Sequence, residues 1–383
     1  MTTILFWSMA ALVTYVYAGY PLLLLGMRAL VGTRAIGQSD ERPTVTLIVS
    51  AYNEAAVIAA KLANSLELDY PAERLQIVVV SDASSDQTDA IVRATGDARV
   101  SLLRMQTRGG KTTGLNAAVA ASQSEVIVFS DANAMYGREA LTALVRNFGD
   151  PHVGAVVGES GYTRSDAGAD EHESLYWRYE GLIKRLESAL GSVVGGDGAI
   201  YAIRRSLYRP MPAAALSDFV NPLQIVRAGY RCIYEPAARS VESGAGDFAR
   251  EFRRKVRIVN RGWRALRLVG GLLNPARFGF FSLELLSHKV LRWLVPLFLL
   301  LLLATSFLVL GRGALYAVAL GAQLLLYILA LLGYALQGRG QLPRILALPF
   351  YFVMVNLASA RGIAEAFMGR TYTAWTTARA DAP

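Results

Sequence analysis

The run from Val126 to Asn133, VIVFSDAN, ends a continuous apolar stretch in two side chains that carry oxygen. Such a stretch is typical of a strand buried in an α/β sheet, and these sheets bind their ligands at the carboxyl ends of the strands. Carboxylate and amide oxygens suit a Mg²⁺ or Mn²⁺ ion that substrate phosphates also hold. We therefore predict a metal and diphosphate site at Asp131 and Asn133. For this pair alone, the alternative is an Asx turn that closes a buried strand.

Two more predicted strands end in polar residues. The strand pattern over residues 44–50 breaks into Ala51-Tyr52-Asn53-Glu54, and the pattern over residues 75–80 is followed by Ser81-Asp82. Parallel strands bring their carboxyl ends to one edge of a sheet, so we expect these side chains to lie near Asp131. One polar strand end is merely a loop, whereas several on one edge indicate a site.

Lys111 follows two glycines at the start of a helix pattern that runs to Ala121. Gly110-Lys111-Thr112 is similar to the end of a phosphate-binding P-loop, but the first glycine of that motif would fall at position 105, which is methionine. A P-loop ATPase is therefore excluded. Two alternatives remain for Lys111: contact with a phosphate at the helix start, or an ordinary solvated position in the first turn.

Two acidic residues lie among later turn signals. Asp197 belongs to Gly195-Gly196-Asp197-Gly198, where the glycines permit a positive φ or close approach to a ligand. Asp218 belongs to Leu216-Ser217-Asp218-Phe219, just before a helix pattern over residues 222–228. A helix N-cap at Ser217 or Asp218 is the structural alternative to a chemical role.

Strand and helix patterns alternate at short spacing between residues 44 and 190. Helix patterns cover residues 55–66, 87–94, 111–121 and 171–190, and strand patterns also cover residues 100–103 and 153–157. This alternation predicts an α/β fold with a doubly wound, mostly parallel sheet and right-handed crossovers.

The two ends of the chain are strongly apolar. The 383 residues are 53% hydrophobic, with a mean hydropathy of +0.33, which is too high for an ordinary soluble domain of this length. Residues 1–27 carry no charge and lack the basic start of a cleaved signal peptide, so they predict a retained membrane anchor. Arg28 and Arg34 follow the anchor, and by the positive-inside rule they place the next part of the chain in the cytoplasm.

Residues 293–310 and 314–336 predict two further spans. The run from Ile345 to Ala360 is shorter and contains Pro349 and Asn356, so a third span and an interfacial segment both remain open. Residues 247–268 predict a basic amphipathic helix in the headgroup layer, with its apolar face toward the lipid. Membrane lipids explain the net charge of +9 without nucleic acid, for which no motif is present.

The histidines and the cysteine exclude several mechanisms. Cys232 is the only cysteine, so an intrachain disulfide cannot form. His152, His172 and His288 are far apart and have no metal-ligand spacing. A histidine-based zinc site and a Ser-His-Asp triad are therefore not expected.

Taken in order, these residues resemble the membrane-embedded family 2 glycosyltransferases, the group of cellulose, hyaluronan and poly-N-acetylglucosamine synthases and ceramide glucosyltransferase. Ser50 to Glu54 looks like the first strand end of that family, which implies substrate contacts from Ala51, Asn53 and Glu54. Asp82 is similar to its first aspartate, which contacts the uridine. Asp131-Ala132-Asn133 resembles its metal-binding D-x-D, and Ser217-Asp218 resembles its Glu-Asp pair, whose aspartate is the catalytic base.

Two departures from the family pattern concern the donor and acceptor. The Q-x-x-R-W signature is represented by Arg254-Lys255-Val256-Arg257-Ile258, which lacks the glutamine and the tryptophan. Ser217 stands in place of the glutamate. These differences bear on processive synthesis, whereas the aspartate that carries the chemistry is retained.

We therefore expect an inverting glycosyltransferase with a GT-A fold, in the inner (plasma) membrane, with its catalytic domain in the cytoplasm. The expected parts are an anchor (residues 1–32), a Rossmann-like GT-A domain (40–245), interfacial amphipathic helices (246–288) and a transmembrane region (289–383). The donor would be a nucleotide-sugar, with UDP as the expected nucleotide, and the cofactor would be Mg²⁺ or Mn²⁺. Lys111, Asp197, Arg254 and Arg257 complete the expected substrate contacts.

The acceptor would be a growing polysaccharide, and polysaccharide export proteins would be partners. One alternative is the transfer of a single sugar to a lipid acceptor. The other is a catalytically silent scaffold in a polysaccharide assembly complex, which Asn133 and the degraded signature would suggest.

Overall fold

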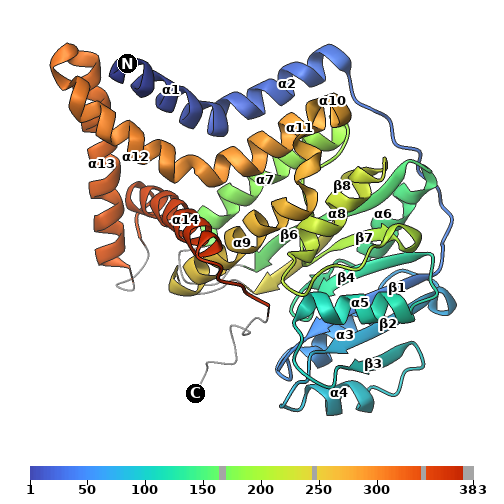
Figure 1. Ribbon diagram of the computed structural model, residues 1–383. Helices are drawn as coiled ribbons and strands as arrows, with labels where there is room; N and C mark the ends of the chain where they lie inside the picture. Colours follow the sequence, from blue (N-terminus) through green and yellow to red (C-terminus); the bar gives the residue numbers. More distant parts are fainter. Residues whose placement is uncertain (164–169, 244–247, 338–341, 374–383) are drawn as a thin grey trace.

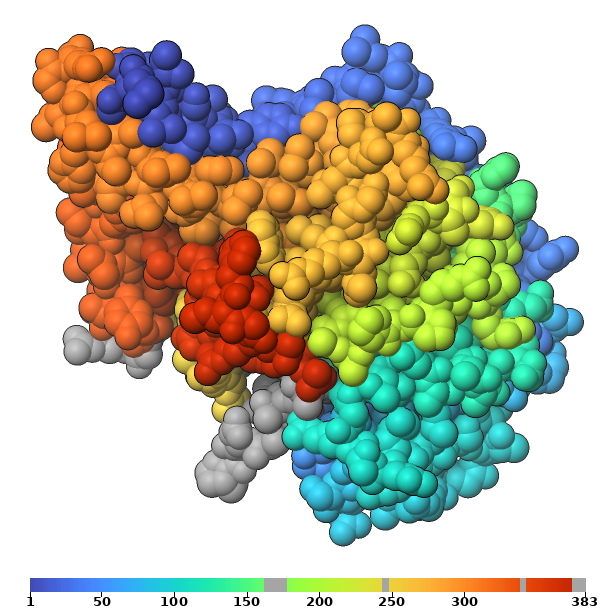
Figure 2. Space-filling model, viewed as in Figure 1, coloured from blue at the N-terminus to red at the C-terminus, as the bar shows by residue number. Residues whose placement is uncertain are grey.

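The computed structural model describes residues 1–163, 170–243, 248–337 and 342–373. A sheet domain carries the predicted site, and helices from both ends of the chain pack together beside it (Figures 1 and 2). The order of elements follows the predicted alternation up to β4.

The sheet has eight strands in the order β3-β2-β1-β4-β7-β6-β8-β5. The strands are β1 Val45–Ala51, β2 Leu75–Ser81, β3 Val100–Arg104, β4 Val126–Asp131, β5 Met135–Tyr136, β6 Val153–Thr163, β7 Tyr201–Arg204 and β8 Arg231–Ser243. The half formed by β3, β2, β1 and β4 is parallel, as predicted. In the other half β7 is antiparallel to β4 and β6, and β5 is antiparallel to β8. The sheet is therefore mixed and not mostly parallel throughout, because β7 runs opposite to the strands on both of its sides.

Helices cover both faces of the sheet because neighbouring strand residues point to opposite sides. Leu47 packs in a core with residues of α3 and α6, whereas the next residue, Ile48, packs in a second core with residues of α5 and α8. The helices of this domain are α3 Ile58–Leu66, α4 Thr88–Ala94, α5 Lys111–Ala121, α6 Ala140–Val145, α7 Asp170–Leu190 and α8 Ser217–Arg227.

Among the residues that the structure describes, four helical segments are long and apolar enough to cross a membrane: Thr2–Val31, Phe280–Arg312, Ala314–Leu336 and Arg344–Phe367. They contain α1 Thr2–Thr14, α2 Tyr20–Val31, α11 Phe280–Leu285, α12 Arg292–Val309, α13 Ala314–Leu336 and α14 Arg344–Phe367. Arg312, in the turn between α12 and α13, donates to Thr3 Oγ1, and the rings of Phe6 and Tyr316 lie 5.1 Å apart. The start of α1 and this turn therefore lie at the same end of the helical bundle (Figure 1).

Helix α9 (Phe248–Val269) is the predicted basic amphipathic helix, but the expected contact of its apolar face with lipid is wrong. Val256 and Val259 are buried against protein, and the backbone of α14 comes so close that a Cβ on Gly362 would lie 2.7 Å from Val256 O. The hydrophobic period of a helix shows which face is apolar but not whether protein or lipid covers that face.

Helix α14 settles the secondary structure of the interrupted run from Ile345 to Ala360. It is one continuous helix through Pro349, and Asn356 satisfies its amide by donating to Phe352 O at 2.9 Å. It packs along α9, from the ring pair of Phe248 and Phe350 (4.8 Å) to that of Trp263 and Phe367 (6.0 Å).

Candidate active site

The register of the sheet aligns the predicted strand ends. Ala51 pairs with Ser81, and Ser50 pairs with Asp131. The ends of β1, β2 and β4 therefore meet at one edge, as predicted. Ala51 is buried, and its carbonyl accepts the amide of Asp82 at 2.9 Å.

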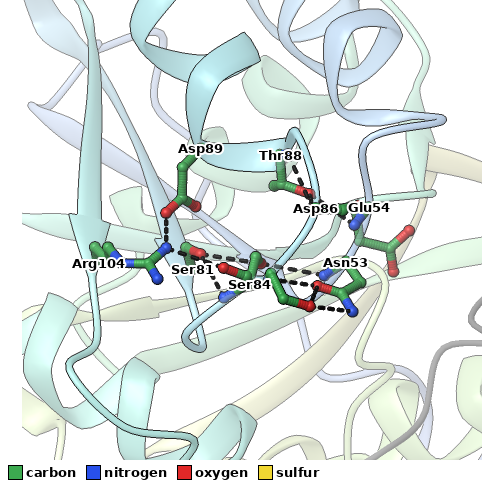
Figure 3. A network of polar contacts seen from close by, with 9 residues as sticks. Asn53, Glu54, Ser81, Ser84, Asp86, Thr88, Asp89 and Arg104 are labelled. Carbon is green, nitrogen blue, oxygen red and sulfur yellow. Dashed lines mark hydrogen bonds and ion pairs between the residues drawn. The ribbon is translucent and has the colours of Figure 1, made fainter.

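The loops after β1 and β2 hold each other by side-chain bonds to the backbone (Figure 3). Asn53 has a φ of 52°, a left-handed conformation that asparagine tolerates better than most residues. Its side-chain Oδ1 accepts a hydrogen bond from the backbone N–H of Ser85 at 2.8 Å, and its backbone N–H donates to Ser84 Oγ at 3.1 Å. Asn53 therefore holds the loop after β1 against the loop after β2.

Glu54 enters the same network through its backbone, since its amide donates to Thr88 Oγ1 at 2.8 Å. Asp86 accepts from Ala55 N and from Thr88 N, both at 3.0 Å. Arg104, at the end of β3, donates to Ser84 O at 3.1 Å and pairs with Asp89 (Figure 3). These bonds hold the loops that follow β1 and β2 in place through contacts within the protein.

Asp82 uses both carboxylate oxygens to hold the loop before α5. Oδ1 accepts the amide of Gly109 at 2.7 Å, and Oδ2 accepts the amide of Gly110 at 2.9 Å. Gly110 has a φ of 84°, which only glycine adopts readily. This loop starts helix α5 and thereby directs Lys111 toward the end of β4.

Lys111 pairs with Asp131 through Nζ and Oδ1, and its Nζ also lies 3.4 Å from Gly198 O. Its side chain is only 14% exposed, so the solvated alternative is wrong. Burial opposes its charge, but the carboxylates of Asp131 and Asp218 outweigh burial and raise the pKa of Lys111. Lys111 is therefore a fixed cation at the predicted diphosphate site.

Gly198 is the point at which the main side chains converge. A Cβ at this position would lie 3.2 Å from Lys111 Nζ, 3.4 Å from Asp218 Oδ2 and 3.6 Å from Asp131 Oδ2. The structure thus brings together one cation and two carboxylates from β4, α5 and α8, which are far apart in the sequence. A side chain at position 198 would press against the ammonium group of Lys111.

Asp218 lies inside the first turn of α8, which begins at Ser217 and has Leu216 as its N-cap residue. No side chain in the described part of the chain caps this helix, so the N-cap alternative is wrong. Pro222 has no N–H to offer the carbonyl four residues earlier, and that carbonyl belongs to Asp218. It instead accepts the amide of Gly196 at 2.6 Å, and a Cβ on Gly196 would clash with it at 2.8 Å. Pro222 and Gly196 thus allow helix α8 and the glycine loop to join at this carbonyl.

The surroundings of Asp218 make its carboxylate more basic. Burial raises its pKa, as do the charges of Asp197 and Asp131, whereas Lys111 and Arg261 act in the opposite direction. A carboxylate with a raised pKa accepts a proton more readily, which suits a general base.

Asp197 lies at the margin of this group. Its Oδ1 accepts the amide of Ala199 at 3.1 Å, and its Oδ2 lies 4.0 Å from Lys184 of α7. It therefore shapes the glycine loop, and its charge acts on Asp218.

Arg254 and Arg257 differ in their surroundings. Arg254 makes two hydrogen bonds to Glu251, at 2.6 and 2.9 Å. Burial and Arg254 lower the pKa of Arg257, while Asp131, Tyr372 and Asp218 raise it. The charges of Asp131 and Asp218 therefore both act on Arg257.

Glu242 of β8 carries no sequence motif and was not predicted. Burial and the charges of Asp131 and Asp197 raise its pKa to about 8. Glu242 is therefore a further acidic group near the site, in addition to Asp131, Asp197 and Asp218. No local pattern in the strand could have revealed it.

Lys61 and Asn64 of α3 were also not predicted, and both hold the segment that follows Asn133. Lys61 is fully buried, donates to Ala134 O and lies 4.0 Å from the ring centre of Tyr136. Asn64 makes two bonds to the backbone of Tyr136, at 2.8 and 2.9 Å. Helix α3 therefore positions the turn that contains Asp131 and Asn133.

The donor set at this turn fits a divalent cation. Asp131 is 34% exposed at the end of β4, and Asn133 follows it in a partly exposed turn. Both offer the oxygen atoms that Mg²⁺ and Mn²⁺ prefer, and one or two protein ligands suffice when phosphates complete the shell.

We expect Lys61→Met and Asn64→Leu each to weaken Mn²⁺ binding, because each releases backbone that supports the turn. An Ala134 carbonyl left without its donor costs about 1–3 kcal/mol. Binding can be measured by electron paramagnetic resonance of Mn²⁺ with nucleoside diphosphate present. Tighter binding in Lys61→Met would show that its positive charge matters and not its hydrogen bond.

Residues 46–210 match the family model named Glycosyl transferase family 2. This chain contains a family 2 glycosyltransferase domain. The match includes the strand ends, Lys111 and Asp131, and it stops before Asp218. The GT-A fold of this domain is the Rossmann-like arrangement that the sequence predicted.

Several curated proteins resemble the family 2 domain and its surroundings. A probable glycosyltransferase, YdaM, of Bacillus subtilis is 35% identical over 213 residues, which are 52% of this chain and 50% of that protein. An N-acetylglucosaminyltransferase of Rhizobium meliloti is 29% identical over 51% of this chain and 50% of its own. A beta-monoglucosyldiacylglycerol synthase of Trichormus variabilis is 31% identical over 35% of this chain and 32% of its own. The chain thus spans half or less of the length of these relatives.

One solved structure resembles the glycosyltransferase domain together with the helices around it. It is a mannosyltransferase from Pyrobaculum calidifontis in complex with GDP-Man and Mn²⁺. The match has a TM-score of 0.70 at 25% identity and covers 96% of this chain and 99% of the other. The arrangement of the N-terminal helices, the sheet domain and the C-terminal helices is therefore shared with this solved mannosyltransferase.

Proposed function

We propose that this protein is an inverting glycosyltransferase that moves a sugar from a nucleotide-sugar to a hydroxyl group of an acceptor held at the membrane. The observation that carries this proposal is the convergence of Lys111, Asp131 and Asp218 around Gly198. A cation for the diphosphate and a base for the acceptor then lie on either side of one reacting centre.

The proposed reaction follows from these positions. The acceptor oxygen attacks the anomeric carbon while the bond from that carbon to the diphosphate breaks, so the configuration inverts. Asp218 takes the proton of the attacking hydroxyl. Lys111 and Arg257 stabilise the nucleoside diphosphate that leaves. A divalent ion on Asp131 and Asn133 would neutralise part of the charge on that leaving group.

The donor is proposed to be UDP-linked, from the resemblance of Asp82 and the strand ends to the uridine-binding members of the family. The solved mannosyltransferase is in complex with GDP-Man, so the nucleotide of the donor has to be tested directly. Hydrolysis or transfer assays with UDP- and GDP-sugars on the purified protein would decide, and preference for GDP would refute the UDP assignment.

For the acceptor, a growing polysaccharide is the expectation from the resemblance, and one structural observation favours a lipid. Phe219, next to the base, lies 5.8 Å from Trp293, and Trp293 lies 6.4 Å from Trp263. Trp263 contacts Phe367, whose side chain is 71% exposed. Aromatic side chains thus lead from the base to the membrane helices. Partition of radiolabelled product between organic solvent and water would distinguish a glycolipid from a polymer, and absence of both transfer and donor hydrolysis would favour a silent scaffold.

We also propose that the sheet domain faces the cytoplasm and that α14 lies along the membrane surface. Arg28 and Arg34 follow the anchor, and α14 packs along the basic helix α9, which leads out of the sheet domain (Figure 1). On this topology the tail after α14 stays on the cytoplasmic side.

Cysteine labelling of intact cells tests this topology in a Cys232→Ser background. We expect a Gln123→Cys site in the sheet domain to resist a membrane-impermeant reagent. Gly311→Cys, in the turn between α12 and α13, is the matched control and should be labelled. The reverse pattern would overturn the orientation.

A further inference from the structure

Arg261 of α9 is a buried cation that no motif in the sequence singled out. It belongs to the basic helix that the sequence places in the headgroup layer, yet the residue is only 8% exposed. Burying a guanidinium is costly unless its donors find partners, so its contacts indicate what the burial achieves.

The contacts of Arg261 lie on the segment just before the catalytic helix α8. Its Nε donates to Ala214 O at 3.3 Å, and its Nη2 donates to Ala215 O. Thr112 of α5 donates to the same Ala215 carbonyl at 2.8 Å, and its Oγ1 lies 3.3 Å from Arg261 Nη2. Three elements thus meet at one backbone carbonyl.

That carbonyl lies three positions before Asp218 and next to the N-cap residue of α8. The carbonyl of Leu216 in turn accepts the amides of Phe219 and Val220, at 3.1 and 2.8 Å. Moving Ala215 would therefore move the first helical turn, which carries Asp218. The hydroxyl of Thr112 supports this carbonyl from the side of α5.

Helix α9 is itself tied to the membrane helices at this point. A Cβ on Gly262 would lie 2.8 Å from the ring of Trp293, at the start of α12. Phe219 touches the same ring at 5.8 Å. The position of the base therefore depends on parts of the chain beyond the matched family domain, residues 46–210.

We propose that Arg261 is a positioning residue that fixes residues 214–215, so that Asp218 meets the acceptor hydroxyl while the donor site is unaffected. This inference rests on the proposed glycosyltransferase function. It makes the guanidinium of α9 part of the catalytic geometry and not a lipid contact.

The test compares Arg261→Met, Arg261→Lys and Thr112→Val in the full-length protein, with Arg264→Met as the matched control. Arg264 is one turn away on α9 and donates to Arg370 O at 3.4 Å. We expect Arg261→Met to lower kcat for transfer by about 10²-fold, since small displacements of a reacting group cost that much, with unchanged donor KM and UDP affinity. Arg261→Lys should recover part of the loss, because an ammonium group can reach one carbonyl but cannot form the fork.

Thr112→Val should lower kcat in the same direction without changing a charge, and Arg264→Met should behave like wild type. Normal turnover in Arg261→Met, or parallel losses of turnover and UDP affinity, would overturn the inference. If Arg261→Met does not fold, as judged by its thermal unfolding, the lysine and valine variants decide by the same comparison. Failure of the proposed function would look different, because the wild-type protein itself would then neither transfer nor hydrolyse a nucleotide-sugar.

Discussion

Asp218→Asn is expected to lower the rate of sugar transfer by about 10²- to 10⁴-fold, the usual contribution of a general base. Asparagine keeps the shape of the side chain but cannot take the proton of the acceptor hydroxyl. The bond between Gly196 N and the backbone carbonyl of residue 218 should persist, so the glycine loop should keep its place. Binding of UDP, measured by calorimetry, should be close to that of the wild type.

The pH dependence of transfer gives a second measure of the same residue. Burial raises the pKa of Asp218, so the fraction of active carboxylate falls as the pH decreases through a value above the ordinary 3.8. We expect the acid limb of kcat/KM to lie above that value.

Asp197→Asn is the matched control for Asp218. It removes a nearby carboxylate of the glycine loop and leaves the base in place, so it should shift the acid limb downward, since the charge of Asp197 raises the pKa of Asp218. Transfer at the wild-type rate by Asp218→Asn would show that the base lies elsewhere, and a large loss in Asp197→Asn would identify it as the replacement.

The parallel half of the fold and the strand-end residues were predictable because their signals are local. Strands β1, β2 and β4 are continuous apolar runs, and each is followed at once by the polar residues that face the crevice. Strands β5 and β7 have only two and four residues, too few to show a period. The mixed character of the sheet could therefore not be foreseen.

The supporting residues of the site could not be predicted because their signals lie in the tertiary packing. Lys61 looks like a solvated lysine of an amphipathic helix until β5 covers it. Arg261 looks like one more lipid-facing arginine until α8 and α5 are placed against it. The convergence at Gly198 joins residues separated by up to 107 positions, between Lys111 and Asp218. Only the tertiary fold shows such a group.

Asp131→Ala is expected to remove transfer almost completely, by more than about 10²-fold, because it affects two parts of the site at once. It takes away the carboxylate oxygens at the end of β4 that would bind the divalent ion. It also deprives Lys111 of the carboxylate with which it pairs. Asp218 is then the nearest acidic group around Gly198, and pairing with Lys111 would hold its carboxylate away from the acceptor.

Lys111→Met in the Asp131→Ala background separates these two effects. If the released lysine blocks the base, the double variant should transfer faster than Asp131→Ala, although neither should bind Mn²⁺ normally. A double variant that is slower than Asp131→Ala would show that Lys111 acts chiefly on the leaving diphosphate and does not block the base. Full activity of the wild-type protein in excess chelator would refute the metal site altogether.

Asn133→Asp tests the second ligand of the same site. It restores the second carboxylate of the D-x-D pattern, so it should lower the Mn²⁺ concentration needed for half-maximal transfer and tighten Mn²⁺ binding measured by electron paramagnetic resonance. The fold should tolerate the change, because residue 133 is partly exposed in the turn after β4. If Asp131→Ala abolishes Mn²⁺ binding while Asn133→Asp leaves it unaltered, Asn133 is not a ligand, and the second protein oxygen has to come from another acidic group close to Asp131, with Glu242 the first to replace.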